Sequence, residues 1–134
     1  MINSSRKVTI VEDDILLLLI LERLVQKFGY EVSGTAYTGE GAYRMIQLHK
    51  PDIILMDINL EDEIKGTEVV EMIRKDGSET PVIFISGEKK PAEILKINLL
   101  GSTDFLLKPI ESEVLSQALQ KARTFKEHEG LYTP

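Results

Sequence analysis

The chain has 134 residues, no cysteine and a formal net charge of −6 at pH 7. This length suits one domain with one core, and the absence of cysteine excludes disulfides, thiolate nucleophiles and thiolate zinc sites. The negative charge argues against direct binding to nucleic acid or anionic membranes, because both need a basic face. The longest apolar run, 15–21, is too short for membrane insertion, and we expect a cytoplasmic protein.

Short apolar runs alternate along the chain with stretches of helical periodicity. Strands are predicted over 7–11, 30–36, 53–56, 82–85 and 105–107. Helices are predicted over 15 to about 29, 39–49, 66 to about 77, 91 to about 101, and about 111–122. Such alternation produces right-handed βαβ units. We therefore predict an α/β fold, a five-stranded parallel sheet, doubly wound and flanked by five helices, over 1–124, followed by a loosely ordered tail over 125–134.

The helical periodicity also predicts which side chains face the core. In the first helix these are Leu17, Ile20, Leu21, Leu24, Val25 and Phe28. In the fourth and fifth helices they are Ile94, Leu95, Ile97, Leu99 and Leu100, and then Val114, Leu115, Ala118, Leu119 and Ala122. Leu18 and Leu19 fall off the predicted inward face of the first helix, and we expect both to be exposed.

Polar side chains stand at the carboxyl ends of four predicted strands. They are Glu12, Asp13, Asp57, Ser86 and Lys108. The carboxyl ends of parallel strands meet at one edge of the sheet, where α/β proteins bind their ligands, so we expect these side chains to converge. Coincidence is the alternative, because Asp often begins a turn. It explains poorly why carboxylates, a hydroxyl and an ammonium group occur together.

Clustered carboxylates repel one another, so this arrangement calls for a cation. Oxygen ligands without His or Cys favour Mg²⁺, with Mn²⁺ as an alternative. A metal ion, a lysine and a hydroxyl around one aspartate are typical of phosphoryl transfer. Asp57 would attack in line, while the metal and Lys108 would offset charge on the phosphoryl oxygens and Ser86 would hydrogen-bond one of them.

On these residues the chain resembles a response-regulator receiver domain of bacterial two-component signalling, which has a flavodoxin-like topology. The matching motifs are Val11-Glu12-Asp13, Leu55-Met56-Asp57, Ser86-Gly87 and Phe105-Leu106-Leu107-Lys108-Pro109. Each motif alone is weak, but the four in this order and at these spacings are highly specific. The resemblance spans about 7–124, which is nearly the whole chain.

The resemblance implies that Asp57 accepts a phosphoryl group from a phosphohistidine. It implies that Asp13 and Asp57 bind Mg²⁺ directly, that the backbone carbonyl of Asn59 adds a ligand, and that Glu12 acts through water. Asp14 lies one place beyond the family's acidic pair and is left out of the metal site. Such a domain is not an enzyme acting on other substrates. It is a phosphoprotein that promotes its own phosphorylation and dephosphorylation.

The family also couples its chemistry to a conformational switch. By resemblance, Ser86 would move toward the phosphoryl oxygen while Phe105 turns inward, which would change the face around the fifth strand. An ordinary core aromatic is the alternative for Phe105. Asn59 and Glu88 occupy positions that tune hydrolysis in the family, and polar residues there predict a short-lived phosphorylated state.

Partner docking is assigned to Leu18, Leu19 and Pro109. In the family, the region around the first helix receives the four-helix bundle of a histidine kinase or a histidine phosphotransfer protein, and these are the expected partners. The Lys108-Pro109 bond is cis in the family.

The loop after Asp57 departs from the family pattern. It is one residue longer before Gly66 than the commonest spacing, and Glu61 stands where proline is usual. We expect a longer, more acidic and more mobile loop.

A calcium-binding loop is one rival interpretation. Asp57, Asn59, Glu61 and Glu68 match four of its ligand positions, but Asp62 stands where that loop needs glycine.

A flavin or nucleotide binder is a second rival, because such proteins share the fold class. Arg44 occupies the third glycine position of the dinucleotide fingerprint, and the sequence has no P-loop. A purely structural receiver is a third, and the intact set of site residues argues against it.

Few residues follow the last predicted helix, so we expect output to pass through an unidentified protein target. A receiver module excised from a hybrid histidine kinase is the alternative, and a phosphorylation-dependent homodimer is a further option.

Overall fold

The computed structural model describes residues 6–60 and 63–132, in which strands and helices alternate. The strands are β1 (Lys7–Val11), β2 (Glu31–Ala36), β3 (Ile53–Asp57), β4 (Val82–Ser86) and β5 (Asp104–Leu107). The helices are α1 (Ile15–Lys27), α2 (Gly39–His49), α3 (Gly66–Lys75), α4 (Pro91–Leu99) and α5 (Ser112–Tyr132). Every predicted element is present, with α5 longer than expected.

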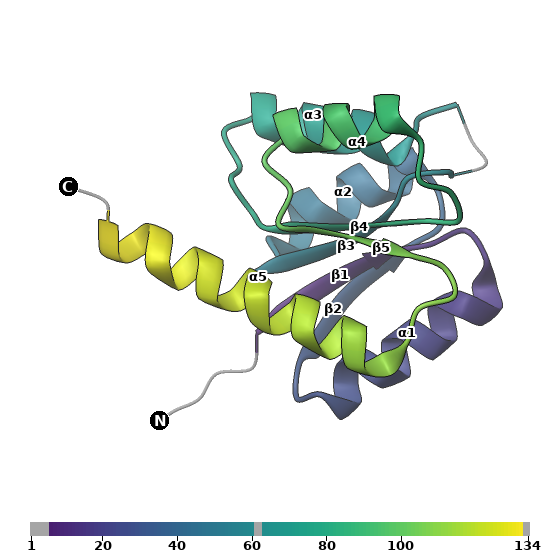
Figure 1. Ribbon diagram of the computed structural model, residues 1–134, viewed down its shortest axis with the longest axis horizontal. Helices are drawn as coiled ribbons and strands as arrows, with labels where there is room; N and C mark the ends of the chain where they lie inside the picture. Colours follow the sequence, from purple (N-terminus) through teal and green to yellow (C-terminus); the bar gives the residue numbers. More distant parts are fainter. Residues whose placement is uncertain (1–5, 61–62, 133–134) are drawn as a thin grey trace.

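The backbone of α5 remains helical through Tyr132, across the boundary predicted between 124 and 125. In Figure 1 this helix extends beyond the edge of the sheet. The division into a domain and a tail stays a prediction. Glu61 and Asp62, to which the acidic-loop and calcium-loop interpretations refer, lie outside the described residues.

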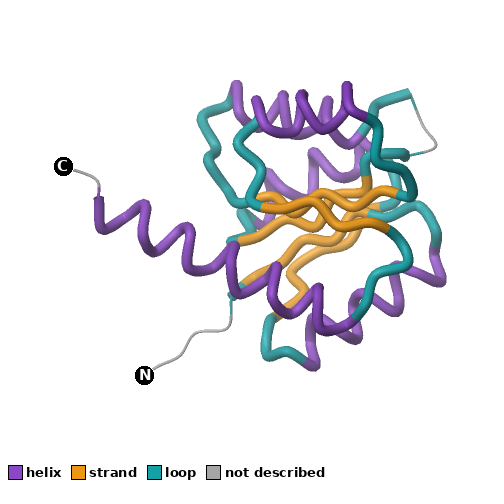
Figure 2. The backbone as a smooth tube through the Cα atoms, viewed as in Figure 1, coloured by secondary structure: helices purple, strands orange, loops and turns teal. Residues whose placement is uncertain are grey.

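The five strands form one parallel sheet in the order β2-β1-β3-β4-β5. Helices α1 and α5 cover one face, and α2, α3 and α4 cover the other (Figures 1 and 2). This confirms the predicted doubly wound α/β fold. The chain adds β2 on one side of β1 and β3 on the other, so the direction of winding reverses between β1 and β3. Ligand sites of such sheets lie at this reversal, outside the carboxyl ends of the strands.

The central strand β3 is buried along its whole length. Ile53 and Leu55 belong to the apolar core under α1 and α5, whereas Ile54 and Met56 belong to the core under α2, α3 and α4. Burying an aliphatic side chain contributes about 1.5–3 kcal/mol, so two cores fix this strand from both sides. Asp57, the last residue of β3, is therefore held at a rigid position.

The inward face of α1 differs from the prediction. Leu18 is 7% exposed and packs in the core, whereas Ile20 is 47% exposed. The buried positions are Leu18, Leu21 and Val25. Because 15–21 is entirely apolar, the sequence offers no polar contrast that would indicate which side faces inward. The prediction of an exposed Leu18 was wrong, and that of an exposed Leu19 is confirmed at 53%.

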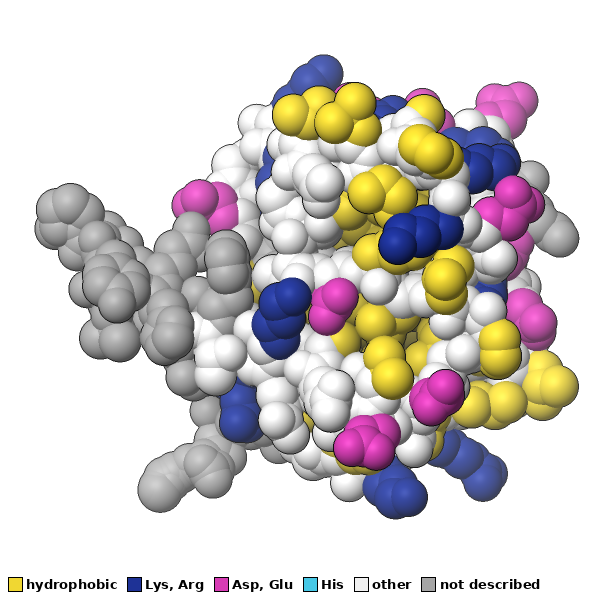
Figure 3. All heavy atoms as spheres, viewed as in Figure 1, with side chains coloured by type: hydrophobic (Ala, Val, Ile, Leu, Met, Phe, Trp, Pro, Cys, Tyr) yellow, Lys and Arg dark blue, Asp and Glu magenta, His cyan; other side chains and the backbone are white. Residues whose placement is uncertain are grey.

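Helix α4 buries less of its apolar surface than the periodicity indicates. Ile97 is buried, but Leu95 and Leu99 are 63% and 80% exposed. Val114 at the start of α5 is also exposed, so these three inward assignments were wrong. Apolar side chains accordingly lie at the surface over α4, at the top of Figure 3, and others lie over α1 at its lower right.

None of the helices within the described part of the chain has both the length and the hydrophobicity needed to cross a bilayer.

Candidate functional site

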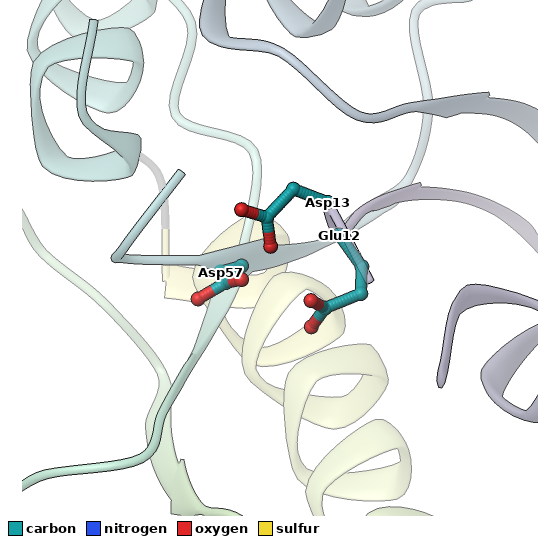
Figure 4. Close-up of side chains that lie close together, drawn as sticks. All are labelled: Glu12, Asp13 and Asp57. Carbon is teal, nitrogen blue, oxygen red and sulfur yellow. The ribbon is translucent and has the colours of Figure 1, made fainter. Parts of the chain in front are cut away.

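Three carboxylates meet where β1 and β3 end (Figure 4). Glu12 and Asp13 follow β1 directly, and Asp57 closes β3. Parallel pairing sets Val11 beside Met56, so the next residues of both strands emerge together. The three side chains offer ligand atoms that all lie within 4.8 Å of one another. The predicted convergence of these carboxylates at one sheet edge is present in the fold.

Glu12 is fully buried, which is unusual for a carboxylate. Its Oε2 accepts a hydrogen bond from the Asp14 backbone N–H at 3.1 Å. Among the described residues its Oε1 accepts no hydrogen bond of good geometry. Burial raises the pKa of Glu12 to about 7, and the negative charge of Asp57 adds to that rise. A buried carboxylate of this kind needs a cation beside it.

Lys108 bridges two of the carboxylates. Its Nζ lies 3.1 Å from Glu12 Oε1 and 3.3 Å from Asp57 Oδ2. Burial works to lower the pKa of Lys108, but attraction to Asp57 and Glu12 outweighs it and raises that pKa above the usual value. The Lys108-Pro109 peptide bond is cis, as the resemblance implied. The Lys108 backbone N–H donates to the Ser86 carbonyl at 2.9 Å, which ties the end of β5 to the end of β4.

Asp57 is 1% exposed, and the main chain that follows supports it. The Asn59 backbone N–H donates to Asp57 Oδ1 at 3.0 Å. Gly66 packs against the same residue, because a Cβ at Gly66 would lie 2.1 Å from the Asp57 carbonyl oxygen. The sequence reading assigned Gly66 only to the end of the loop and missed this contact. The feature of the sequence that could have indicated this contact is the presence of a glycine shortly after the candidate acceptor Asp57.

Ser86 lies beside Asp57, because the register sets Asp57 opposite Ile85. Its hydroxyl is fully buried and accepts two hydrogen bonds. One comes from the Asn59 side-chain Nδ2 at 3.2 Å and the other from the Glu88 backbone N–H at 3.1 Å. Asn59 is predicted to tune hydrolysis, and the contact of its side chain with Ser86 was not foreseen.

The remaining predicted residues lie around this centre. Asp14 caps α1, because its Oδ1 accepts from the backbone N–H groups of Leu16 and Leu17 at 3.0 and 3.3 Å. Because this carboxylate oxygen is used to cap the helix, the structure agrees with leaving Asp14 out of the metal site. Phe105 is half-buried and packs against the core under α2, α3 and α4.

Of the three docking residues, Leu19 and Pro109 are exposed, and Leu18 is a core residue. Leu18 therefore cannot contact a partner, because it packs against the sheet. The exposed apolar surface of α1 consists instead of Ile15, Leu16, Leu19 and Ile20. We call these four residues the α1 apolar surface.

The donor set of the pocket fits a hard divalent cation. Glu12, Asp13 and Asp57 supply only oxygen atoms, and their ligand atoms all lie within 4.8 Å of one another. Mg²⁺ prefers carboxylates together with water and phosphate oxygens. The partly exposed Asp13 leaves one side of the pocket accessible, so a phosphate-bearing ligand could approach. The arrangement combines a buried carboxylate, an ammonium group beside it and a hydroxyl, and groups of these kinds can carry out phosphoryl transfer.

Comparisons with known proteins agree with this geometry. The family model of the response regulator receiver domain matches residues 8–120. Chemotaxis protein CheY of Thermotoga maritima is 31% identical over 117 residues, which cover 87% of this chain and 97% of that protein. The probable C4-dicarboxylate response regulator DctR of Bacillus subtilis is 30% identical over 122 residues, covering 90% of this chain and 54% of the relative. The chain thus spans about half the length of that relative.

Solved structures of receiver domains have the same fold as this chain. Chemotaxis protein CheY4 of Vibrio cholerae superposes with a TM-score of 0.82 at 30% identity, over 89% of this chain and 99% of the other. The signal receiver domain of a modulated diguanylate cyclase from Desulfovibrio desulfuricans superposes with a TM-score of 0.85 at 28% identity, over 94% and 99% of the two chains.

Proposed function

The chain belongs to the response regulator receiver domain family, and on that basis we propose that Asp57 is the phosphoacceptor of a two-component phosphorelay. One observation carries the proposal. Asp57 stands at the buried end of β3 with Lys108 Nζ 3.3 Å from its carboxylate and the acidic pair of β1 beside it. A nucleophile, a charge-stabilising ammonium group and a set of metal ligands thereby share one pocket.

In the forward reaction an Asp57 oxygen attacks the phosphorus of a phosphohistidine. The new O–P bond forms as the P–N bond breaks, and the departing imidazole takes the bond electrons and a proton from solvent. Lys108 offsets negative charge on the phosphoryl oxygens, and Ser86 donates its hydroxyl hydrogen to one of them. In the later hydrolytic step, water attacks the phosphoryl group, the bond from phosphorus to the Asp57 oxygen breaks, and inorganic phosphate leaves with the Asp57 carboxylate restored.

Mg²⁺, or Mn²⁺ in its place, would be held by the carboxylates of Asp13 and Asp57 and the backbone carbonyl of Asn59, with Glu12 acting through water. When bound, the ion supplies positive charge that binds the phosphoryl oxygens and neutralises the acidic pocket. Its fit rests on the oxygen-only donor set of Glu12, Asp13 and Asp57, whose ligand atoms all lie within 4.8 Å of one another.

The protein in this proposal is a signalling phosphoacceptor that promotes its own phosphorylation and dephosphorylation. Polar residues at Asn59 and Glu88 favour a short-lived phosphorylated state. The conformational change that follows phosphorylation would pass through Ser86 and Phe105 to the face around β5. An unidentified target protein binds this face. A receiver module within a hybrid histidine kinase would use the same chemistry.

The expected phosphodonor partners are a histidine kinase or a histidine phosphotransfer protein. We propose that such a partner docks on the α1 apolar surface, which begins two residues after the acidic pair. Exposed apolar side chains next to a reaction site are typical of protein interaction surfaces. Leu19 and Pro109 remain in this proposal, and Leu18 does not.

The calcium-loop interpretation has less support. A strand, rather than a helix, leads into Asp57, and Glu68 Oε1 accepts a hydrogen bond from the Lys65 backbone N–H at 2.9 Å. Glu68 thus acts in the cap of α3.

Mass spectrometry after treatment with acetyl phosphate and Mg²⁺ tests the proposed function. The wild-type protein should gain the mass of one phosphoryl group, and Asp57→Asn should not. Omitting Mg²⁺ should abolish the gain. Equal modification of wild type and Asp57→Asn would show that the acceptor lies elsewhere.

A further inference from the structure

The Ser86 hydroxyl is fully engaged as an acceptor in this structure. A serine hydroxyl offers two acceptor lone pairs and one hydrogen to donate. Here the lone pairs accept from Asn59 Nδ2 at 3.2 Å and from the Glu88 backbone N–H at 3.1 Å. Because Ser86 is fully buried, water does not compete for these positions. The present orientation of the hydroxyl is therefore determined by these two donors.

The two donors differ in what they connect. The Glu88 N–H belongs to the same turn as Ser86, two residues further along the chain. Asn59 belongs to the loop after β3, and its backbone N–H also donates to Asp57 Oδ1 at 3.0 Å. Asn59 thus forms a hydrogen bond to Asp57, the proposed phosphoacceptor, through its main chain and another to Ser86 through its side chain.

We propose that the Asn59 side chain is a latch that holds Ser86 in the unphosphorylated orientation, so that forming phosphoaspartate requires the Asn59–Ser86 hydrogen bond to break. This inference rests on the proposed function, because it needs Ser86 to turn toward a phosphoryl group on Asp57. Turning about the Cα–Cβ bond carries the Ser86 Oγ away from the Asn59 amide. The latch then opposes the active state by the free energy of one hydrogen bond.

Binding of beryllofluoride, a phosphoryl analogue that is not hydrolysed, tests the latch without interference from dephosphorylation. Affinity would be measured calorimetrically with saturating Mg²⁺ in wild type, Asn59→Ala, Ser86→Ala and the double variant. Asn59→Ala should bind the analogue about two- to tenfold more tightly, which corresponds to the net free energy of one hydrogen bond. In the Ser86→Ala background the same substitution should change the affinity less than about twofold, because the latch has already lost its partner.

Equal effects of Asn59→Ala in both backgrounds would overturn the latch, as would weaker binding by the single variant. Separate titrations with Mg²⁺ alone, for wild type and Asn59→Ala, measure how far the substitution acts through the metal, because the Asn59 carbonyl is one of the proposed ligands. If Asn59→Ala changed the Mg²⁺ affinity as much as the beryllofluoride affinity, the side chain would act through the metal and the latch would be wrong.

The proposed function and the latch fail in distinguishable ways. Wild-type protein that does not bind beryllofluoride, or binds it equally well as Asp57→Asn, would overturn the proposed function and the latch with it. Wild-type protein that binds the analogue but shows no coupling between Asn59 and Ser86 would overturn the latch alone. In the ligand-free protein, the NMR resonances of the Asn59 side-chain amide should shift in Ser86→Ala, and unchanged resonances would contradict the hydrogen bond itself.

Discussion

Lys108 Nζ lies 3.3 Å from Asp57 Oδ2, so the ammonium group occupies the acidic pocket before any phosphoryl group arrives. The same atom lies 3.1 Å from Glu12 Oε1. Lysine therefore serves both carboxylates in the resting protein, and its positive charge opposes that of a metal ion bound to them.

Lys108→Ala should have opposite effects on Mg²⁺ binding and on the rate of phosphorylation. Removing the ammonium group should strengthen Mg²⁺ binding severalfold, because a competing positive charge next to the proposed metal ligands is lost. Phosphorylation by acetyl phosphate should nevertheless slow by tenfold or more, because the phosphoryl oxygens lose a stabilising cation. Calorimetric titration and mass spectrometry measure the two quantities. A variant with weaker Mg²⁺ binding would contradict the proposed arrangement.

Glu12 should make the stability of the metal-free protein depend on pH. Its pKa rises from 4.5 to about 7 on folding, mainly through burial. The folded state therefore favours the protonated form, and the stabilisation it contributes is full below pH 4.5 and is lost as the pH rises through about 7.

Urea unfolding in EDTA at several pH values, for wild type and Glu12→Gln, checks this contribution. The free energy of unfolding of the wild type should fall relative to that of Glu12→Gln as the pH rises through 7. Added Mg²⁺ should offset the fall, because it binds the ionised carboxylates. Parallel pH profiles of the two proteins would show that Glu12 titrates alike in the folded and unfolded states.

Gly66→Ala should destabilise the protein at the acceptor. The new Cβ would lie 2.1 Å from the Asp57 carbonyl oxygen, and that backbone atom could give way only if β3 or α3 shifted. We expect a loss of about 2 kcal/mol or more in the free energy of unfolding. Gly87→Ala is the matched control, because a Cβ there meets nothing within 4 Å, and it should change stability by less than about 0.5 kcal/mol. Similar losses in both variants would rule out the close contact as the cause.

Leu18 and Leu19 should respond differently to truncation. Leu18→Ala removes a buried side chain and should reduce the free energy of unfolding by about 2–5 kcal/mol. Leu19→Ala alters a side chain that is 53% exposed and should cost less than about 1 kcal/mol. Urea unfolding of the two variants decides which neighbour faces the core, and the reverse order would favour the sequence-based assignment.

The α1 apolar surface should govern transfer from a protein donor. A variant with Leu16→Lys and Leu19→Lys should receive phosphoryl groups from a phosphorylated histidine phosphotransfer protein at least tenfold more slowly than the wild type. Phosphorylation by acetyl phosphate should be unchanged, because the pocket itself is intact. Leu99→Lys, on the exposed side of α4, is the control for adding charge to an apolar surface. Slower reaction with both donors would mean that the substitutions disturb the pocket.

The fold and the pocket were predictable because their signals are local. Strand–helix alternation fixes a doubly wound sheet, and parallel strands bring Asp13, Asp57 and Lys108 to one edge wherever the rest of the chain lies. Which side of α1 faces the core was not predictable, because 15–21 carries no polar residue that would distinguish the two sides. The contact between Asn59 and Ser86 depends on the directions of two side chains, one in the loop after β3 and one at the end of β4, which sequence spacing does not encode.

The complete burial of β3 has a consequence for how the protein can respond to its own chemistry. The strand is bonded to β1 on one side and β4 on the other, so its amide protons should exchange with solvent only when the whole domain unfolds. The Asp57 backbone then serves as a fixed reference point rather than a moving part. Any signal that starts there must travel outward through side-chain rotations and through the loops at the carboxyl ends of the strands, whose amide protons should exchange far more readily.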